Sequence, residues 1–307
     1  MGAGDVVLVA HSTRSGVVES IHHGAVVALA ADGSVAWTAG NPDAAVYPRS
    51  SLKPLQAQAM VGAGLDVPLE LLAIACGSHH GELHHVDAVR RLLATAGLDE
   101  SALQNSPALP LSTAAAEDAI RARTGPSSLL QNCSGKHAAM LATSVARGWP
   151  TEGYLDPQHP VQLSIHAYVA EVAGGVVHTG IDGCGAPTAM VSLAGLARAV
   201  RHLAVSGAAA YRAMIAHPAL VAGAGGDDTE LMAAEPGLAI KGGAEGVAVA
   251  AHADGRAVAL KVADGSGRAR LPVLLAALRS LGFTADVPVP AVLGHGRPVG
   301  EIAALVP

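Results

Sequence analysis

The stretch "GVAVAAHADGRAVALKVAD", residues 246–264, contains two apolar runs that meet at Asp254-Gly255. An Asp-Gly pair between such runs is typical of a tight β-hairpin, because glycine readily adopts the positive φ that these turns require. The run "GLAIKGG", residues 237–243, comes just before and predicts a third antiparallel strand. These residues therefore predict a sheet in the last third of the chain.

A similar pattern lies at the other end of the chain. "DVVLVA", residues 5–10, is a short apolar run, and "GAVVALAADGSVAWTAG", residues 24–40, holds two more around Asp32-Gly33. Elsewhere, apolar residues recur at spacings of three and four, which is typical of amphipathic helices. We expect helices over 50–64, 68–75, 82–96, 114–123, 134–147, 158–173, 188–204, 207–216 and 270–282.

Strands at both ends with helices between them define the expected fold class, α/β (α+β). The economical arrangement is one antiparallel sheet made from both chain ends, flanked by helices and carrying an inserted helical region. We expect a single domain over residues 1–307, because this length fits one large domain. Its sheet parts would span about 1–49 and 236–307, and its helical part about 50–235.

Composition argues against several classes of function. Hydrophobic residues make up 50% of the chain and charged residues 14%, so a large core is expected. The net charge of −6 and the lack of a lysine/arginine run argue against a nucleic-acid partner. No apolar run is long enough for a membrane helix, and the start lacks the basic region of a signal peptide. With only three cysteines, we expect a cytoplasmic protein with reduced thiols and no membrane partner.

Lysine is scarce in this chain, with four lysines against fifteen arginines. Unlike arginine, lysine can lose its proton inside a protein, so a scarce lysine is a candidate for chemistry. In "YPRSSLKPLQ", residues 47–56, Lys53 lies one helical turn after Ser50. At that spacing a neutral lysine can take the proton of the serine hydroxyl and create a nucleophile. The same pattern also fits a helix N-cap followed by a solvated lysine.

Two further stretches carry the same residue types. "CGSHHGELHH", residues 76–85, puts Ser78 at a glycine-bounded junction, where it either exposes its hydroxyl or caps the next helix. The histidines do not form an H-E-x-x-H motif and also fit a polar loop and helix face. Lys241 in "AIKGG", residues 239–243, ends a strand beside glycines that permit close approach of a ligand. This order is similar to that of penicillin-binding serine acyltransferases, although the threonine of K-T-G is absent.

Two glycine-flanked motifs hold most of the remaining reactive groups. "NCSGKHAAM", residues 132–140, and "GIDGCGAPTAM", residues 180–190, contain two of the three cysteines, a lysine and an aspartate. Two thiolates, a carboxylate and a neutral amine can form a tetrahedral zinc site, or the thiols simply line a pocket. "GAGGDD", residues 223–228, follows no predicted strand and lacks Lys-Ser/Thr, so we assign it no phosphate-binding role.

Six motifs together resemble the asparaginase II family, the serine–lysine type of asparaginase. They occur in order between about residues 15 and 282 and read "RSSLKPLQA", "SHHGE", "NCSGKH", "DGCGAPT", "HPALVAG" and "IKGGAEG". The resemblance implies a catalytic domain with a fold similar to serine β-lactamases and glutaminases, a homodimer, and zinc near the reaction centre. It implies hydrolysis of L-asparagine to L-aspartate and ammonia. The chain departs from the family pattern near Gly226, where an arginine is missing.

Matched residue by residue, the resemblance places two serine–lysine pairs, Ser50 with Lys53 and Ser78 with Lys241. We favour Ser50 as the nucleophile because it occupies the S-x-x-K position. The expected metal ligands are Cys133, Lys136 and Cys184, with Asp182 beside them. The expected substrate contacts are Arg49, which is adjacent to Ser50, together with His79 and Gly242.

Two other functions fit parts of the same pattern. One is a penicillin-recognising or D-amino-acid amidohydrolase; the absent threonine argues against it, and turnover of nitrocefin would argue for it. The other is a catalytically silent protein that binds zinc or a small molecule. The presence of all four serine–lysine residues argues against a silent protein. Release of ammonia from asparagine, compared with glutamine and buffer alone, would distinguish an asparaginase from these alternatives.

Overall fold

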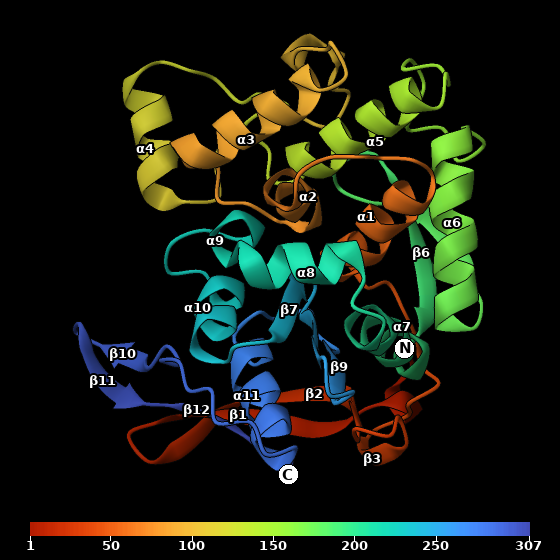
Figure 1. The fold of residues 1–307 in the computed structure, drawn as a ribbon. Coiled ribbons are helices and arrows are strands. Elements are labelled where there is room, and N and C mark those ends of the chain that lie inside the picture. The colour runs from red at the N-terminus through yellow and green to blue at the C-terminus, as the bar shows by residue number, and fades with distance from the viewer.

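A seven-stranded antiparallel sheet built from both ends of the chain is the largest element of the structure (Figure 1). The computed structural model describes residues 1–307. The strands run in the order β12-β1-β2-β9-β8-β7, and β3 also pairs with β2. Their bounds are β1 (Val7–Arg14), β2 (Val17–Leu29), β3 (Val35–Ala39), β7 (Leu238–Gly243), β8 (Val247–His252), β9 (Ala257–Val262) and β12 (Ile302–Ala304). The sheet predicted from the two ends of the sequence is confirmed.

The pairing of β2 with β9 joins the two halves of the sheet. Gly24 of β2 lies opposite Val262 of β9, so strands from distant parts of the sequence become neighbours. The hairpin of β8 and β9 turns at Asp254-Gly255 as predicted, and Gly255 has a φ of +99°. The tight turn therefore uses the positive φ for which glycine was expected.

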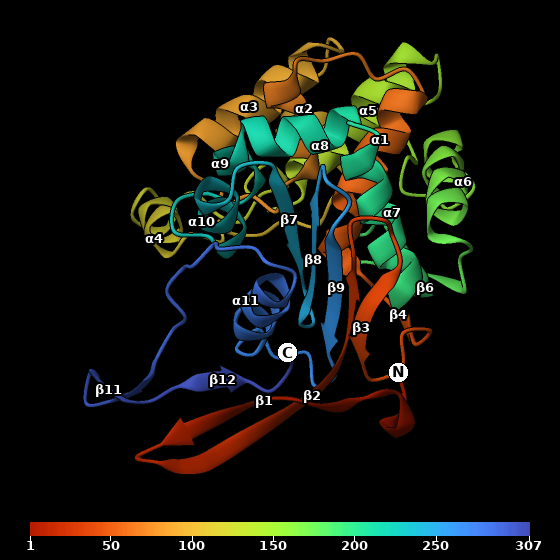
Figure 2. The same ribbon diagram turned by 60° about the horizontal axis from the view of Figure 1, so that its bottom comes forward.

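Helices cover both faces of the central strands. Every residue of β7 is buried, and β8 and β9 are each buried at all but one position. Because successive strand residues point to opposite faces, such continuous burial requires cover on both sides. Helix α7 (Leu193–Val205) packs on β2, β8 and β9, whereas α11 (Arg270–Ser280) packs on β1, β9 and β12 (Figure 2).

The remaining helices gather beyond one end of β7–β9, where their apolar faces continue the core of the sheet (Figure 1). Their bounds are α1 (Lys53–Gly62), α2 (Leu69–Cys76), α3 (Leu83–Ala94), α4 (Thr113–Arg121), α5 (Ser134–Ala146), α6 (Pro160–Ala173), α8 (Ala209–Ala216), α9 (Pro218–Val221) and α10 (Asp227–Ala234). Two smaller sheets consist of β4 (Ala45–Val46), β5 (His178–Ile181) and β6 (Pro187–Ser192), and of β10 (Val292–Gly294) and β11 (Arg297–Gly300). None of the helices combines the length and the apolar composition needed to cross a bilayer.

One expected helix, 188–204, is wrong at its start. Its first residues form strand β6, and the helix begins at Leu193. The Ser192 hydroxyl accepts a hydrogen bond from the Gly195 N–H at 3.0 Å and so caps the helix there. The short helices α9 and α10 were not predicted, because each contains too few apolar positions to display a helical period.

Candidate active site

The Ser-x-x-Lys segment lies against the end of strand β7. It forms a 3₁₀ turn, Arg49–Leu52, that leads into α1, and the Ser51 hydroxyl donates to the Lys241 carbonyl at 2.9 Å. A Cβ on Gly243 would lie 2.5 Å from the carbonyl oxygen of Pro48. Only glycine admits this contact, which explains why a Lys-Gly-Gly strand end accompanies the segment.

Four of the predicted residues line one cavity of about 400 Å³. Ser50 reaches it from the 3₁₀ turn, Ser78 from the junction between α2 and α3, and Lys241 and Gly242 from β7. Asn132, which precedes helix α5, contributes a further side of the cavity. The structure thus brings the two predicted serines and the strand lysine together, although they are far apart in sequence.

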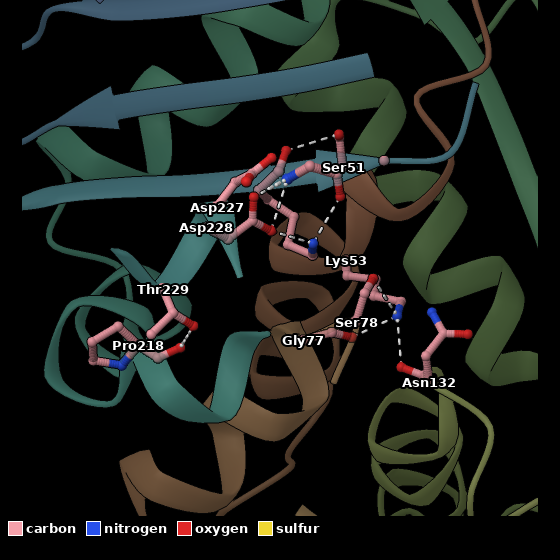
Figure 3. A network of polar contacts seen from close by, with 12 residues as sticks. Ser51, Lys53, Gly77, Ser78, Asn132, Pro218, Asp227, Asp228 and Thr229 are labelled. Atoms are coloured by element: carbon pink, nitrogen blue, oxygen red, sulfur yellow. Dashed lines mark hydrogen bonds and ion pairs between the residues drawn. The ribbon is translucent and has the colours of Figure 1, made fainter. Parts of the chain in front are cut away.

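Lys53 is bound to Ser78, and no hydrogen bond joins it to Ser50 (Figure 3). Its Nζ lies 3.0 Å from Ser78 Oγ and also donates to the carbonyl oxygens of Gly77 and, at 3.2 Å, Asn132. The side chain is only 1% exposed. The expected pair of Ser50 with Lys53 is therefore not formed, and the lysine of the S-x-x-K segment contacts the second serine instead.

Burial favours the neutral form of the Lys53 amine. Removal from water lowers its pKa from the usual lysine value, and the neighbouring charges of Lys136 and Lys241 lower it further. The thiols of Cys133 and Cys184 act in the opposite direction when they are ionised. A neutral amine has two N–H groups and one lone pair. In that neutral form the two carbonyls would take the N–H groups, and the lone pair would face the hydroxyl of Ser78.

Lys241 is paired with Asp228, and it is not bound to Ser78. Its Nζ lies 2.7 Å from Asp228 Oδ2 and donates to the Gly242 carbonyl at 2.7 Å, while the Gly242 N–H donates to both carboxylate oxygens. Burial raises the pKa of Asp228, but Lys241 and Arg270 outweigh it and lower the pKa overall. Lys241 therefore forms a closed ion pair in the cavity wall.

Two of the three predicted substrate contacts lie away from this cavity. His79 is fully buried; its Nε2 lies 2.8 Å from Ser134 Oγ and its Nδ1 accepts the Gly81 N–H, whereas His80 lines the cavity. Arg49 has a φ of +53° and donates to Asp182 Oδ1 at 2.6 Å. It lines a separate cavity beside β5 and β6. Arg49 was assigned from its adjacency to Ser50, but the backbone turns its side chain toward the other cavity.

The predicted metal ligands do come together next to Lys53. Lys136 Nζ lies 3.2 Å from Cys184 Sγ, and Cys133 is hydrogen-bonded to Cys184. The shared hydrogen bond between the two thiols lowers the pKa of Cys133 and raises that of Cys184. Burial lowers the pKa of Lys136, but the nearby sulfur groups and Asp182 outweigh it and raise it. Two buried thiols and an amine within contact distance fit the donor set of a tetrahedral zinc site.

The histidine-rich loop is a weaker metal site. Donor atoms of Glu82, His84 and His85 lie within 4.8 Å of one another. However, His85 Nδ1 accepts the Glu82 N–H and its Nε2 lies 2.8 Å from the Ala219 carbonyl. Because both ring nitrogens are already engaged, the histidine cannot serve as a ligand without losing one of these bonds.

Three charged residues of the cavity escaped the sequence analysis. Asp227 and Asp228 come from the glycine-rich stretch that was given no role, and Arg270 comes from the start of α11. Adjacent acids at a helix start are an ordinary capping pattern, so they did not stand out. The sequence holds one indication that Arg270 has a role, because a cation is unfavourable at a helix N-terminus unless something pairs with it.

The chain is an α/β protein with a buried lysine held against a serine hydroxyl, in a cavity at the end of an antiparallel sheet. The chain belongs to the L-asparaginase II family, which matches residues 10–304. The family resemblance of the six motifs is confirmed.

Solved structures similar to this chain are remote in sequence. One is a β-lactamase from Mycobacterium bovis, with 16% identity and a TM-score of 0.42, covering 85% of this chain and 95% of that one. Another is Mglu in its native form, with 16% identity and a TM-score of 0.38, covering 86% of this chain and 66% of that one. No curated protein matches the chain.

Proposed function

We propose that this protein hydrolyses the side-chain amide of L-asparagine to L-aspartate and ammonia. One observation carries the chemistry: the buried Lys53 amine lies 3.0 Å from the hydroxyl of Ser78, at the wall of a cavity. Membership of the L-asparaginase II family supports the choice of substrate. The whole chain would act as one catalytic domain, since the cavity takes residues from both its helical and its sheet parts.

In the first half-reaction the neutral Lys53 takes the proton of Ser78 as the serine oxygen attacks the amide carbon. The tetrahedral intermediate then collapses, the proton passes from Lys53 to the departing nitrogen, and ammonia leaves. This step produces an ester between Ser78 and the aspartyl group. In the second half-reaction Lys53 takes a proton from water, the hydroxide attacks the ester, and L-aspartate leaves as Ser78 regains its proton. Ser50 lies on the same cavity and would help to pass protons to the leaving group.

The thiol–amine cluster would hold zinc through Cys133, Lys136 and Cys184. Asp182 would stand at its edge, because Arg49 and the Gly183 N–H already engage Oδ1. When bound, zinc would supply a Lewis acid and a fixed positive charge beside the reaction centre. Lys136 must give up its proton to become a ligand, so this role competes with its pairing to the thiols.

The decisive measurement is release of ammonia from asparagine, from glutamine and from buffer alone, with nitrocefin as a test for β-lactam turnover. The Ser78→Ala variant should lose about 10³-fold or more in kcat/KM, since it removes the nucleophile. Ser50→Ala should lose less, and Ser206→Ala, at a surface helix end, should match the wild type. If Ser50→Ala is inactive and Ser78→Ala remains active, the nucleophile is Ser50. Absence of ammonia release by the wild type would refute the activity itself.

A further inference from the structure

Arg270 places a guanidinium group at the wall of the catalytic cavity. It is the first residue of α11, and its side chain is 25% exposed. Nη2 donates to Asp227 Oδ2 at 2.9 Å, and Nη1 approaches the Gly243 carbonyl at 3.5 Å. Because a guanidinium has five N–H donors, most of them remain free for a ligand.

The surrounding backbone is shaped to admit this side chain. A Cβ on Gly242 would lie 2.8 Å from Arg270 Nη1 and 3.1 Å from Asp228 Oδ1. Glycine at this position therefore lets the guanidinium rest directly on strand β7. The helix start gives Arg270 no electrostatic benefit, since helix N-termini favour anions. Its position calls for a different explanation from helix stability.

The wall of the cavity contains two ion pairs, which differ in how many of their hydrogen-bonding groups remain available to a ligand. Lys241 and Asp228 are 2% and 9% exposed, and Asp228 uses both oxygens on the amine and the Gly242 N–H. Arg270 and Asp227 are 25% and 37% exposed, and Asp227 uses only Oδ2. The inner pair is thus saturated within the protein. The outer pair presents a positive and a negative group side by side to the cavity.

A free amino acid carries the complementary pair of charges on its α-carbon. Its carboxylate can accept two parallel hydrogen bonds from a guanidinium, and its ammonium can donate to a carboxylate. Arg49, which the sequence had indicated for the carboxylate, is held by Asp182 and lines another cavity. Among the residues that line the catalytic cavity, Arg270 is the only arginine.

We propose that Arg270 binds the α-carboxylate of the substrate and that Asp227 binds its α-ammonium group. This assignment rests on the proposed function, and it makes the enzyme selective for amides of free α-amino acids over amides within peptides. The two contacts would also orient the side-chain amide toward Ser78.

The first test uses the wild-type protein and two analogues of asparagine. Succinamate lacks the α-ammonium group, and β-alaninamide lacks the α-carboxylate. Each loses a charge-assisted contact, so kcat/KM should fall by about 100-fold for each relative to asparagine. Equal turnover of asparagine and both analogues would overturn the assignment while leaving the amidase activity in place.

Variants then connect each analogue to its residue. Arg270→Met should lower kcat/KM for asparagine by about 100-fold, mainly through KM, and should leave β-alaninamide almost unchanged. Asp227→Asn should lower kcat/KM for asparagine but leave kcat/KM for succinamate almost unchanged. The matched control is Arg268→Met, two residues earlier and exposed, which should resemble the wild type. If Arg270→Met lowers kcat/KM equally for asparagine and β-alaninamide, the arginine has only a structural role.

Binding of the product separates this inference from the proposed function. Calorimetry should detect L-aspartate binding to the wild type, and binding at least about tenfold weaker to Arg270→Met. If aspartate binds in this pattern but asparagine is not hydrolysed, the assignment stands and the proposed activity falls. If asparagine is hydrolysed but neither the affinity for aspartate nor kcat/KM for asparagine depends on Arg270, the activity stands and the assignment falls. If the wild type binds neither amino acid, both fall.

Discussion

Lys53, the proposed base, is held in the fold at a cost in stability. Its amine is enclosed by protein, and its three polar neighbours are two carbonyls and one hydroxyl. No carboxylate accompanies it, in contrast to Lys241 with Asp228. A buried amine without a carboxylate partner destabilises the folded state as long as it carries a proton and the neighbouring thiols stay neutral. Such an arrangement persists where function depends on it.

Substitution of Lys53 by methionine should therefore separate activity from stability. Lys53→Met removes the base and should lower turnover of asparagine by about 10³-fold. The same change should raise the free energy of unfolding by about 1 kcal/mol at neutral pH, because an apolar chain of similar length replaces a desolvated amine. Ammonia release and thermal unfolding measure the two effects. Lys261→Met, on strand β9 outside the catalytic cavity, is the matched control and should keep its activity.

The pH dependence should follow the same amine. Because burial lowers the pKa of Lys53 below the ordinary value of 10.5, kcat/KM should rise with pH and level off before that value. The unfolded chain binds the proton more tightly than the folded one between the two pKa values. The free energy of unfolding should consequently increase with pH across that window, and Lys53→Met should lose this slope. A flat rate profile across it would contradict the role of Lys53 as the base.

At the scale of the elements, the close approach of the 3₁₀ turn to β7 assembles the site. Gly243→Ala would push a Cβ to within 2.5 Å of the Pro48 carbonyl and 2.9 Å of Ser51 Oγ. We expect a loss of about 1–3 kcal/mol of stability and a clear loss of turnover, since Ser50 would leave its position. Gly62→Ala, at the open end of α1, is the control and should be neutral or slightly stabilising. Equal behaviour of the two variants would show that the contact is not tight.

The zinc proposal also depends on two elements meeting, the start of α5 and the turn between β5 and β6. We expect up to one zinc per chain by elemental analysis, and none in Cys133→Ser/Cys184→Ser. Affinity should fall with falling pH, because the thiols and the Lys136 amine must be deprotonated to bind. The thermal transition should survive chelation, since a chain of this size has a core independent of metal. An unchanged zinc content in the double variant would show that zinc binds at another site.

At the scale of the whole molecule, the ion pair of Asp228 and Lys241 fastens the helical region to the sheet. Removal of the charge in Asp228→Asn leaves a buried ammonium unpaired and should cost roughly 3–5 kcal/mol at neutral pH. Because the pKa of Asp228 is lowered in the fold, its contribution is complete above the ordinary value of 3.8 and disappears as pH falls through the folded pKa. Acid unfolding curves of wild type and variant should therefore converge at low pH.

The sequence predicted the parts of this molecule that depend on local pattern. The hairpin turn at Asp254-Gly255 follows from the positive φ that glycine allows, and the helix after Ser50 follows from the helical spacing of its apolar residues. Ser50, Ser78, Lys241 and Gly242 were named and line one cavity, but the predicted pairing of the serines with the lysines was wrong. Lys53 meets Ser78 and not Ser50, because the choice depends on how α1 and α2 pack. Arg270 was not assigned to the site for the same reason, since only the folded sheet brings α11 beside β7.

The pairing of Gly24 with Val262 has a consequence for the synthesis of the protein. Strand β2 leaves the ribosome well before β9 exists, and at about 5–20 residues per second the delay is on the order of 10–50 s. During this interval the run "AVVAL", residues 25–29, has an unpaired edge with high β-propensity and no charge. We expect the nascent chain to need protection by chaperones at this stage, and the active site to form only after translation has passed the last strands of the sheet.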